Sequence, residues 1–158
     1  MKTSPHPHPE PIIRLADRRD AEAVAACVRA AFSPYIERIG KPPAPMLADF
    51  PAIISAGKVW VAEADHRVAG VLVQYATEHG FYIDTVAVLP GLQGTGIGRA
   101  LLIFAEDEAQ KRGFSSIYLC TNVKMTENQV FYPKIGYLEY ERKTDEGYDR
   151  IFYRKQLK

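Results

Sequence analysis

The segment Val86-Ala87-Val88-Leu89-Pro90-Gly91-Leu92-Gln93-Gly94-Thr95-Gly96-Ile97-Gly98-Arg99 joins a short apolar run to a glycine-rich turn and to the start of an amphipathic helix. Glycines at alternate positions allow the backbone to take positive φ angles and to come close to a ligand. A helix that begins directly after them presents unpaired N–H groups and the positive end of its dipole. The segment therefore predicts a site for an anion, and in particular for a phosphate.

Three phosphate-binding patterns can be compared with this turn. A P-loop requires Lys followed by Ser or Thr after its last glycine, whereas Arg99 follows Gly98 here. A dinucleotide-binding turn that starts at Gly94 requires glycine at position 99, and it also requires an acidic residue after the next strand. Both are missing, which makes a Rossmann-like oxidoreductase a poor reading of this chain. The pattern Q/R-x-x-G-x-G/A fits completely, from Gln93 to Gly98.

This pattern and its surroundings resemble one known family. The turn follows Val86–Pro90, precedes a helix, and has the segment Tyr132-Pro-Lys-Ile-Gly136-Tyr137 downstream. With these features the chain, from Ile12 to Leu157, resembles the GNAT superfamily of acetyl-CoA-dependent N-acetyltransferases. The resemblance implies an α/β fold with a mixed, mostly antiparallel central sheet flanked by helices and a splayed parallel strand pair at the acetyl-CoA site. It also implies acetyl-CoA as cosubstrate without a metal, and direct acetyl transfer to a primary amine in a ternary complex.

The resemblance also implies which residues hold coenzyme A. In the family, the strand before the turn leaves backbone groups free for the pantetheine arm, and those groups belong here to Val86, Ala87 and Val88. The turn would bind the pyrophosphate through backbone N–H groups and the side chain of Arg99. The candidate residues of this part are Gln93, Gly94, Thr95, Gly96, Ile97, Gly98 and Arg99, with Asn128 as a further coenzyme A contact. The alternative reading is a tight connection between strand and helix.

Tyr132 and Asp84 are the candidate catalytic residues. The resemblance implies that Tyr132 donates a proton as the coenzyme A thiolate leaves, and a phenol is a hydrogen-bond donor at neutral pH. The attacking amine must lose a proton, and Asp84, on the strand beside the site, is a candidate base. Tyr82 shares its face of the strand because side chains alternate with a period of two. Packing of Tyr132 in the core, and pairing of Asp84 with a neighbouring Arg or Lys, are the alternatives.

The helix that carries Tyr132 departs from the family pattern. Met125 stands where that pattern places Asn, seven residues before Tyr132, and Asn128 stands where a small apolar residue is usual. Pro133 removes one backbone donor and disfavours helical geometry at the residue before it. The segment Thr126–Gln129 fits a capping box, which predicts the start of a short helix there.

Acceptor recognition is assigned to the proline-rich stretch from Tyr35 to Met46. In GNAT proteins the corresponding segment helps to wall the acceptor pocket, and here Glu37 offers a charge for an amine while Arg38 offers one for a carboxylate. A rigid surface loop with a solvated charge pair is the alternative. The acceptor is a small-molecule or peptide amine whose identity does not follow from the sequence. The candidate substrate-binding residues are Tyr35, Arg38, Met46 and Tyr82.

The pattern of apolar residues predicts one domain over residues 12–158, behind an extended Pro- and His-rich tail over residues 1–11. Residues 33–45 contain four prolines and are expected to form a loop. Helices are expected from Asp17 or Asp20 to Phe32, over 47–54, over 97–112, and from Thr126 to about Gly136. Strands are expected over 12–16, 58–64, 68–75, 81–89, 116–120, 137–142 and 148–157.

Composition narrows the classes of function. The chain has 20 Lys and Arg against 19 Asp and Glu, which gives no support to a nucleic-acid or membrane-surface partner. Cys27 and Cys120 lack metal-ligand spacing and fit a reducing, cytoplasmic compartment. A homodimer is a further expectation that comes only from the resemblance. The remaining alternative is a sensor or interaction module that binds acyl-CoA with the same fold and has no transfer activity.

Overall fold

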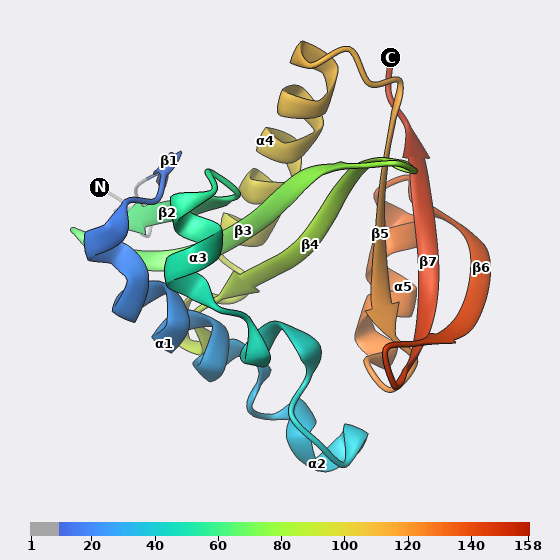
Figure 1. Cartoon of the computed structure of the whole chain (residues 1–158), viewed down its shortest axis with the longest axis horizontal. Coiled ribbons are helices and arrows are strands. Elements are labelled where there is room, and N and C mark those ends of the chain that lie inside the picture. Colours follow the sequence, from blue (N-terminus) through green and yellow to red (C-terminus); the bar gives the residue numbers. More distant parts are fainter. Residues whose placement is uncertain (1–9) are drawn as a thin grey trace, which may run out of the picture.

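Seven strands form one mixed sheet in the order β1-β2-β3-β4-β5-β7-β6 in a computed structural model that describes residues 10–158 (Figure 1). Neighbouring strands run antiparallel except β4 and β5, which are parallel. This confirms the expected mixed, mostly antiparallel sheet, and each expected strand is present with its ends shifted by at most three residues. The predicted tail lies almost wholly outside the described residues. The strands are β1 (Ile12–Leu15), β2 (Val59–Ala64), β3 (Arg67–Thr77), β4 (Gly80–Val88), β5 (Ser116–Asn122), β6 (Leu138–Asp145) and β7 (Tyr148–Gln156).

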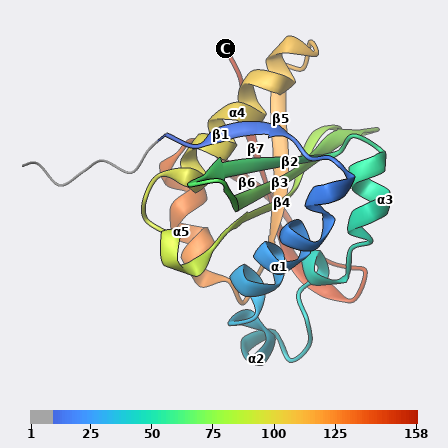
Figure 2. The same ribbon diagram turned by 90° about the vertical axis from the view of Figure 1, so that its left-hand side faces the viewer.

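Helices pack on both faces of the sheet. Figure 2 shows α1 (Ala21–Phe32) and α3 (Phe50–Ser55) on one side, with α4 (Ile97–Lys111) and α5 (Thr126–Lys134) on the other. On the face that carries α1, the part of the sheet formed by β5, β7 and β6 has no helix of residues 10–158 in front of it (Figure 1). None of the helices in this described part is long and apolar enough to cross a membrane.

The expectation for residues 33–54 is wrong in two respects. The stretch expected as a loop contains a short helix, α2 (Tyr35–Ile39), which ends at Gly40 with φ 90°. The single helix expected over 47–54 is replaced by the 3-10 turn η2 (Ala44–Leu47) and by α3. The break has a local cause, because the Asp49 side chain accepts a hydrogen bond from the Ala52 N–H and so caps a new helix at Phe50.

The predicted capping box of α5 is also wrong. The Ncap residue is Met125, and no side chain caps the helix there. The Gln129 amide instead donates to the Val123 carbonyl at 2.8 Å, and the Asn128 amide donates to the Thr121 hydroxyl at 2.9 Å. These bonds tie α5 to the end of β5 and so fix the position of the residues that follow on the helix.

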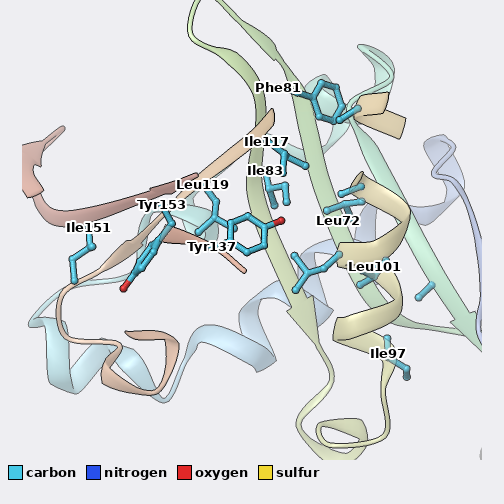
Figure 3. Close-up of a cluster of buried hydrophobic side chains, with 14 of the residues drawn as sticks. Leu72, Phe81, Ile83, Ile97, Leu101, Ile117, Leu119, Tyr137, Ile151 and Tyr153 are labelled. Atoms are coloured by element: carbon cyan, nitrogen blue, oxygen red, sulfur yellow. The ribbon is translucent and has the colours of Figure 1, made fainter. Parts of the chain in front are cut away.

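The core under α4 places that helix directly on β3. Ile97 and Leu101 of α4 belong to a buried cluster that also includes Leu72 and Phe81, all labelled in Figure 3. A Cβ on Gly70 would lie 2.9 Å from Ile97 Cγ2 and 3.0 Å from Leu101 Cδ1. Only glycine allows this approach, and it sets the distance between the sheet and the first turn of α4.

Candidate active site

The parallel strands β4 and β5 separate after a very short contact. They pair only where Phe81, Tyr82 and Ile83 face Ile117, Tyr118 and Leu119. On its other side β4 contains a bulge, because Val73 faces Thr85 while the next residue, Gln74, faces Ile83. Asp84 is therefore an extra residue in β4. A bulge bends its strand and increases the local twist, and this one lies just where β4 leaves β5.

The bulge also changes the face to which the β4 side chains belong. Phe81 and Ile83 lie in the core under α4, whereas beyond the bulge it is Val86 and Val88 that pack against this core. Ala87 lies in the other core, under α1. The alternation of side chains along β4 thus shifts by one position at Asp84. The sequence argument assumed an unbroken period of two along this strand and therefore did not predict the shift.

The backbone of Val86 and Val88 is free on the side of β4 that faces away from β3. The Leu89 N–H donates to the Ala69 carbonyl at 2.9 Å, which marks a hydrogen-bonded pair of the β3–β4 ladder. Because such pairs alternate with non-bonded ones in an antiparallel ladder, Ala87 pairs with β3 while the groups of Val86 and Val88 point away from it. The Val88 carbonyl accepts a weak bond from the Gln93 amide at 3.3 Å. β4 thus offers a strand edge without a strand partner.

The glycine-rich turn presents a row of unpaired donors beside this edge. Gly94 and Gly96 have φ angles of 82° and 95°, and Gly96 is the Ncap residue of α4. The first backbone donor into the helix is the N–H of Ala100, which bonds to the Gly96 carbonyl. Within residues 10–158, five backbone N–H groups of this turn have no backbone partner, namely those of Gly94, Gly96, Ile97, Gly98 and Arg99. Such a cluster at a helix N-terminus suits an anion.

A cavity of about 730 Å³ lies between the separated strands and contains most of the predicted site. Several predicted residues do not line it. Arg38 and Met46 lie outside, and so do Thr95 and Ile97, although the Thr95 hydroxyl holds the turn by donating to the Leu92 carbonyl at 2.5 Å. The predicted residues on the cavity wall are Tyr35, Tyr82, Asp84, Val86, Ala87, Val88, Gln93, Gly94, Gly96, Gly98, Arg99, Asn128 and Tyr132.

Tyr132 reaches the cavity from α5 through a cluster of aromatic rings. Its ring packs edge-on against Tyr137 and lies 5.9 Å from the ring of Tyr153, measured between centroids. Burial raises the pKa of its hydroxyl well above the ordinary value of 10. The raised pKa keeps this hydroxyl protonated, and no group of the described chain hydrogen-bonds to it. The ring is packed, as the alternative reading expected, and donation to the leaving thiolate stays a prediction.

Asp84 accepts two hydrogen bonds from hydroxyl groups. The Tyr75 hydroxyl donates to it at 2.6 Å and the Thr85 hydroxyl at 3.1 Å, and Asp84 forms no ion pair within residues 10–158. Next to it, the Tyr82 hydroxyl lies 3.2 Å from the Cys120 sulfur. Burial raises the pKa of the Cys120 thiol, which keeps it protonated and a poor nucleophile. Asp84 therefore stays the predicted base on this wall.

The segment around α2 is fastened across the cavity to the C-terminal strands and helix. Arg38 forms a two-point ion pair with Glu127 of α5, at 2.7 and 2.8 Å, which lowers the Glu127 pKa to about 2. Lys41 donates to the Gly147 carbonyl at 2.7 Å, and the Tyr148 hydroxyl donates to the Pro42 carbonyl at 2.5 Å. Arg38 is thus engaged by the protein itself.

Sequence reasoning missed several residues of the cavity wall. Glu127, Tyr148 and Arg150 line it, as do Met125 and Phe131. Glu127 and Tyr148 bond to residues of the segment around α2 that lie 89 and 106 positions away in the chain. Arg150 faces Asn122 across neighbouring strands. No local spacing in the sequence marks these three residues. Met125 could have been found, because it stands at the position where the family pattern has Asn. Among residues 10–158 no cluster of His, Cys, Asp or Glu suits a metal ion.

The fold and the cavity define a class of α/β proteins in which two diverging parallel strands open a cavity beside a glycine-rich turn at a helix N-terminus. Residues 14–137 match the model of the acetyltransferase (GNAT) family, and because this covers well over half of the chain, the protein belongs to that family. The expected resemblance is confirmed.

Individual relatives agree with this assignment. Over 68 residues the chain is 35% identical to an aminoalkylphosphonate N-acetyltransferase of Salmonella typhimurium, a match that covers 41% of this chain and 44% of that protein. The chain spans less than two thirds of the length of each curated relative described for it. Its fold is similar to a GNAT-family acetyltransferase from Staphylococcus aureus (TM-score 0.77, 20% identity, 94% and 99% of the two chains). It is also similar to the PaiA N-acetyltransferase of Thermoplasma acidophilum in complex with coenzyme A (TM-score 0.75, 18% identity, 93% and 99%).

Proposed function

We propose that the protein is an N-acetyltransferase that moves an acetyl group from acetyl-CoA to a primary amine in a ternary complex. The observation that carries the proposal is the continuity of the free β4 edge with the unpaired donors of the glycine-rich turn. Pantetheine is an extended chain with two amide groups, so it can pair with the backbone of Val86 and Val88 as a strand would. The pyrophosphate then meets the N–H groups between Gly94 and Arg99.

The remaining side chains supply the chemistry of acyl transfer. The amine nitrogen attacks the thioester carbonyl carbon, the C–N bond forms, and the C–S bond breaks with its electron pair going to sulfur. Tyr132, whose hydroxyl is protonated at neutral pH, gives its proton to the leaving thiolate. The amine loses a proton to Asp84, directly or through water. Bulk solvent restores both groups after the products leave.

Release of free thiol tests the proposal directly. Acetyl-CoA is mixed with a panel of primary amines, including diamines, amino acids, aminoalkylphosphonates and short peptides, and coenzyme A thiol is followed colorimetrically. We expect thiol release that depends on both the enzyme and at least one amine. Binding of acetyl-CoA without amine-dependent thiol release would overturn the proposal in favour of a sensor with the same fold.

The role of Asp84 is tested separately by its pH dependence. In the Asp84→Asn variant we expect transfer to fall by about 10²-fold, the lower limit for a general base, and the rate to depend on deprotonation of the free amine instead. A pH–rate profile with the shape and midpoint of the unchanged enzyme would show that Asp84 is not the base. The Asp49→Asn variant, at the cap of α3, serves as the matched carboxylate control.

A further inference from the structure

A second groove, of about 840 Å³, opens on the helix-free face of β5, β7 and β6 and meets the first cavity. The two spaces share six wall residues, and the central ones are Tyr82, Asp84, Tyr148 and Arg150. If the first cavity holds acetyl-CoA, then an acceptor that lies in this groove reaches the thioester at Asp84. The chemistry of the groove wall therefore bears on which acceptor fits.

Most charged groups of this wall neutralise one another. Arg150 pairs with Asp145 at 2.9 Å and with Glu146 at 3.2 Å, and Lys143 lies 3.7 Å from Glu141. Arg150 faces two carboxylates, so this cluster keeps one negative charge, and two further charged groups of the wall form no ion pair within the described chain. They are the carboxylate of Asp84, which only hydroxyl groups contact, and the guanidinium of Arg154, which has no carboxylate within ion-pair distance.

Arg154 is held in place by neutral groups. It donates to the Ser116 hydroxyl at 2.8 Å and to the His79 carbonyl at 3.0 Å. Its guanidinium lies over the Tyr118 ring, 4.8 Å from the centroid, and 5.5 Å from that of Tyr140. A guanidinium fixed in this way keeps its positive charge for an anion and loses little side-chain entropy when one binds.

The sheet register places the backbones of Asp84 and Arg154 relative to each other. Tyr82 faces Tyr118, and Tyr118 faces Arg154, so β4 and β7 lie two strand spacings apart at this level. Asp84 lies two residues further along β4. With strands about 4.8 Å apart and a rise of about 3.3 Å per residue, the Cα atoms of Asp84 and Arg154 are roughly 12 Å apart. Between them lie the rings of Tyr82 and Tyr118, whose centroids are 4.7 Å apart.

From this arrangement we propose that the preferred acceptor is an amine that carries an anionic group at its far end and an apolar or planar body between the two. Asp84 receives the amine, Tyr82 and Tyr118 contact the body, and Arg154 binds the carboxylate or phosphonate. This inference rests on the proposed function for the position of the acetyl group. It predicts that polyamines are poor acceptors, because their far ammonium group would lie next to the positive charge of Arg154.

The test uses pairs of amines that differ only in the far group, such as the peptide Ala-Phe-Ala with a free carboxylate and the same peptide as its C-terminal amide. Thiol release is measured for each, and binding to the coenzyme A-loaded protein is measured by calorimetry. We expect the anionic member of a pair to have a KM and a Kd at least tenfold lower than the amide. A phosphonate analogue shows which anion Arg154 prefers.

Variants assign the preference to Arg154. Arg154→Gln should raise the KM of the anionic member about tenfold and leave both the amide and acetyl-CoA unchanged, whereas Arg154→Lys should restore part of the preference. Arg142→Gln is the matched control, because Arg142 pairs with Glu139 outside the groove. Melting temperatures show that each variant is folded.

The outcomes separate this inference from the proposed function. Thiol release with equal KM values for the charged and amide members, or equal losses for both in Arg154→Gln, overturns the inference and leaves the acetyltransferase. Charge-dependent binding that Arg154→Gln abolishes, without thiol release for any amine, supports the groove assignment and overturns the transferase. Absence of both binding preference and thiol release overturns both.

Discussion

Tyr132 combines a packed ring with an unpaired hydroxyl, and this makes it a clean target for substitution. In Tyr132→Phe the ring contacts with Tyr137 and Tyr153 remain, and no hydrogen bond of the described chain is lost. We therefore expect the melting temperature and the KM for acetyl-CoA to stay nearly constant while kcat falls by about 10²-fold or more, as for loss of a general acid. Steady-state thiol release measures kcat.

Tyr137→Phe is the control for that variant. The Tyr137 hydroxyl donates a long hydrogen bond to Glu106 at 3.4 Å and does not reach the cavity. Its loss should cost about 1 kcal/mol of stability or less and should not change kcat. Equal losses of kcat in the two variants would mean that Tyr132 acts through packing alone.

The ion pair between Arg38 and Glu127 has a measurable electrostatic signature. Hydrogen bonding to Arg38 lowers the Glu127 pKa from its ordinary 4.5 to about 2. Because the folded-state pKa is the lower one, the pair contributes above about pH 4.5 and its contribution is lost as the pH falls toward 2. In Arg38→Ala we expect the Glu127 pKa to rise toward its ordinary value, which carboxyl carbon NMR can follow. An unchanged Glu127 pKa in Arg38→Ala would contradict the ion pair.

Residue-level roles were only partly accessible from the sequence. The glycine-rich turn is a local pattern, so its residues could be proposed from spacing alone. The sequence offered Arg38 as a charge for the acceptor, but the structure gives it a partner 89 positions away. Arg154 received no role from the sequence, because its significance lies in the absence of a carboxylate partner, which only the folded arrangement reveals.

At the scale of elements, the contact between β3 and α4 depends on one missing side chain. In Gly70→Ala the new methyl group would lie within 3.0 Å of both Ile97 and Leu101. We expect the variant to lose about 1–3 kcal/mol of stability, the usual cost of overpacking, and to bind acetyl-CoA more weakly because the turn that we propose for the pyrophosphate leads into α4. Urea unfolding and calorimetry measure the two effects.

Gly91→Ala is the control for this element. Nothing lies within 4 Å of the Cβ that this change adds, and Gly91 does not have a positive φ angle. The free energy of unfolding of Gly91→Ala should stay within about 0.5 kcal/mol of that of the unchanged protein, as for other surface substitutions. A loss equal to that of Gly70→Ala would show that the helix–strand distance is not the cause.

The elements themselves follow well from the sequence where the pattern is periodic. The strands and the long helices α1 and α4 were predicted with small errors at their ends. The short elements were not, because α2 has five residues and depends on its contacts with α5 and the loop before β7. The bulge at Asp84 gave no signal either, since one extra residue in a nine-residue strand does not disturb an otherwise apolar run.

At the scale of the whole molecule, the sheet consists of two parts that meet through three residue pairs of β4 and β5. A ligand that bonds to the β4 edge and to α4 while it contacts α5 joins these parts. At 100 times its Kd, a ligand that binds only the folded state adds about 2.7 kcal/mol. We therefore expect acetyl-CoA to raise the melting temperature by roughly 5–11 °C.

Thermal unfolding with NADH under the same conditions provides the comparison. A nicotinamide dinucleotide also carries a pyrophosphate, but it lacks the pantetheine amides that would pair with Val86 and Val88. We expect no shift with NADH. A comparable increase with both ligands would indicate that the turn binds pyrophosphate without any contribution from the strand edge.

The bulge in β4 has a consequence for how this protein can vary. Before Asp84 the odd-numbered side chains face α4, and after it the even-numbered ones do. Loss of the Asp84 codon would remove the bulge but leave Val86 and Val88 on the α4 side, because regular alternation after Ile83 reaches the same two residues. An inserted codon between Thr85 and Val88 would instead rotate the later residues of the strand to the opposite face. Insertions should therefore be purged between Thr85 and Val88, whereas a chain without Asp84 should keep the packing of the strand and lose the bend that separates β4 from β5.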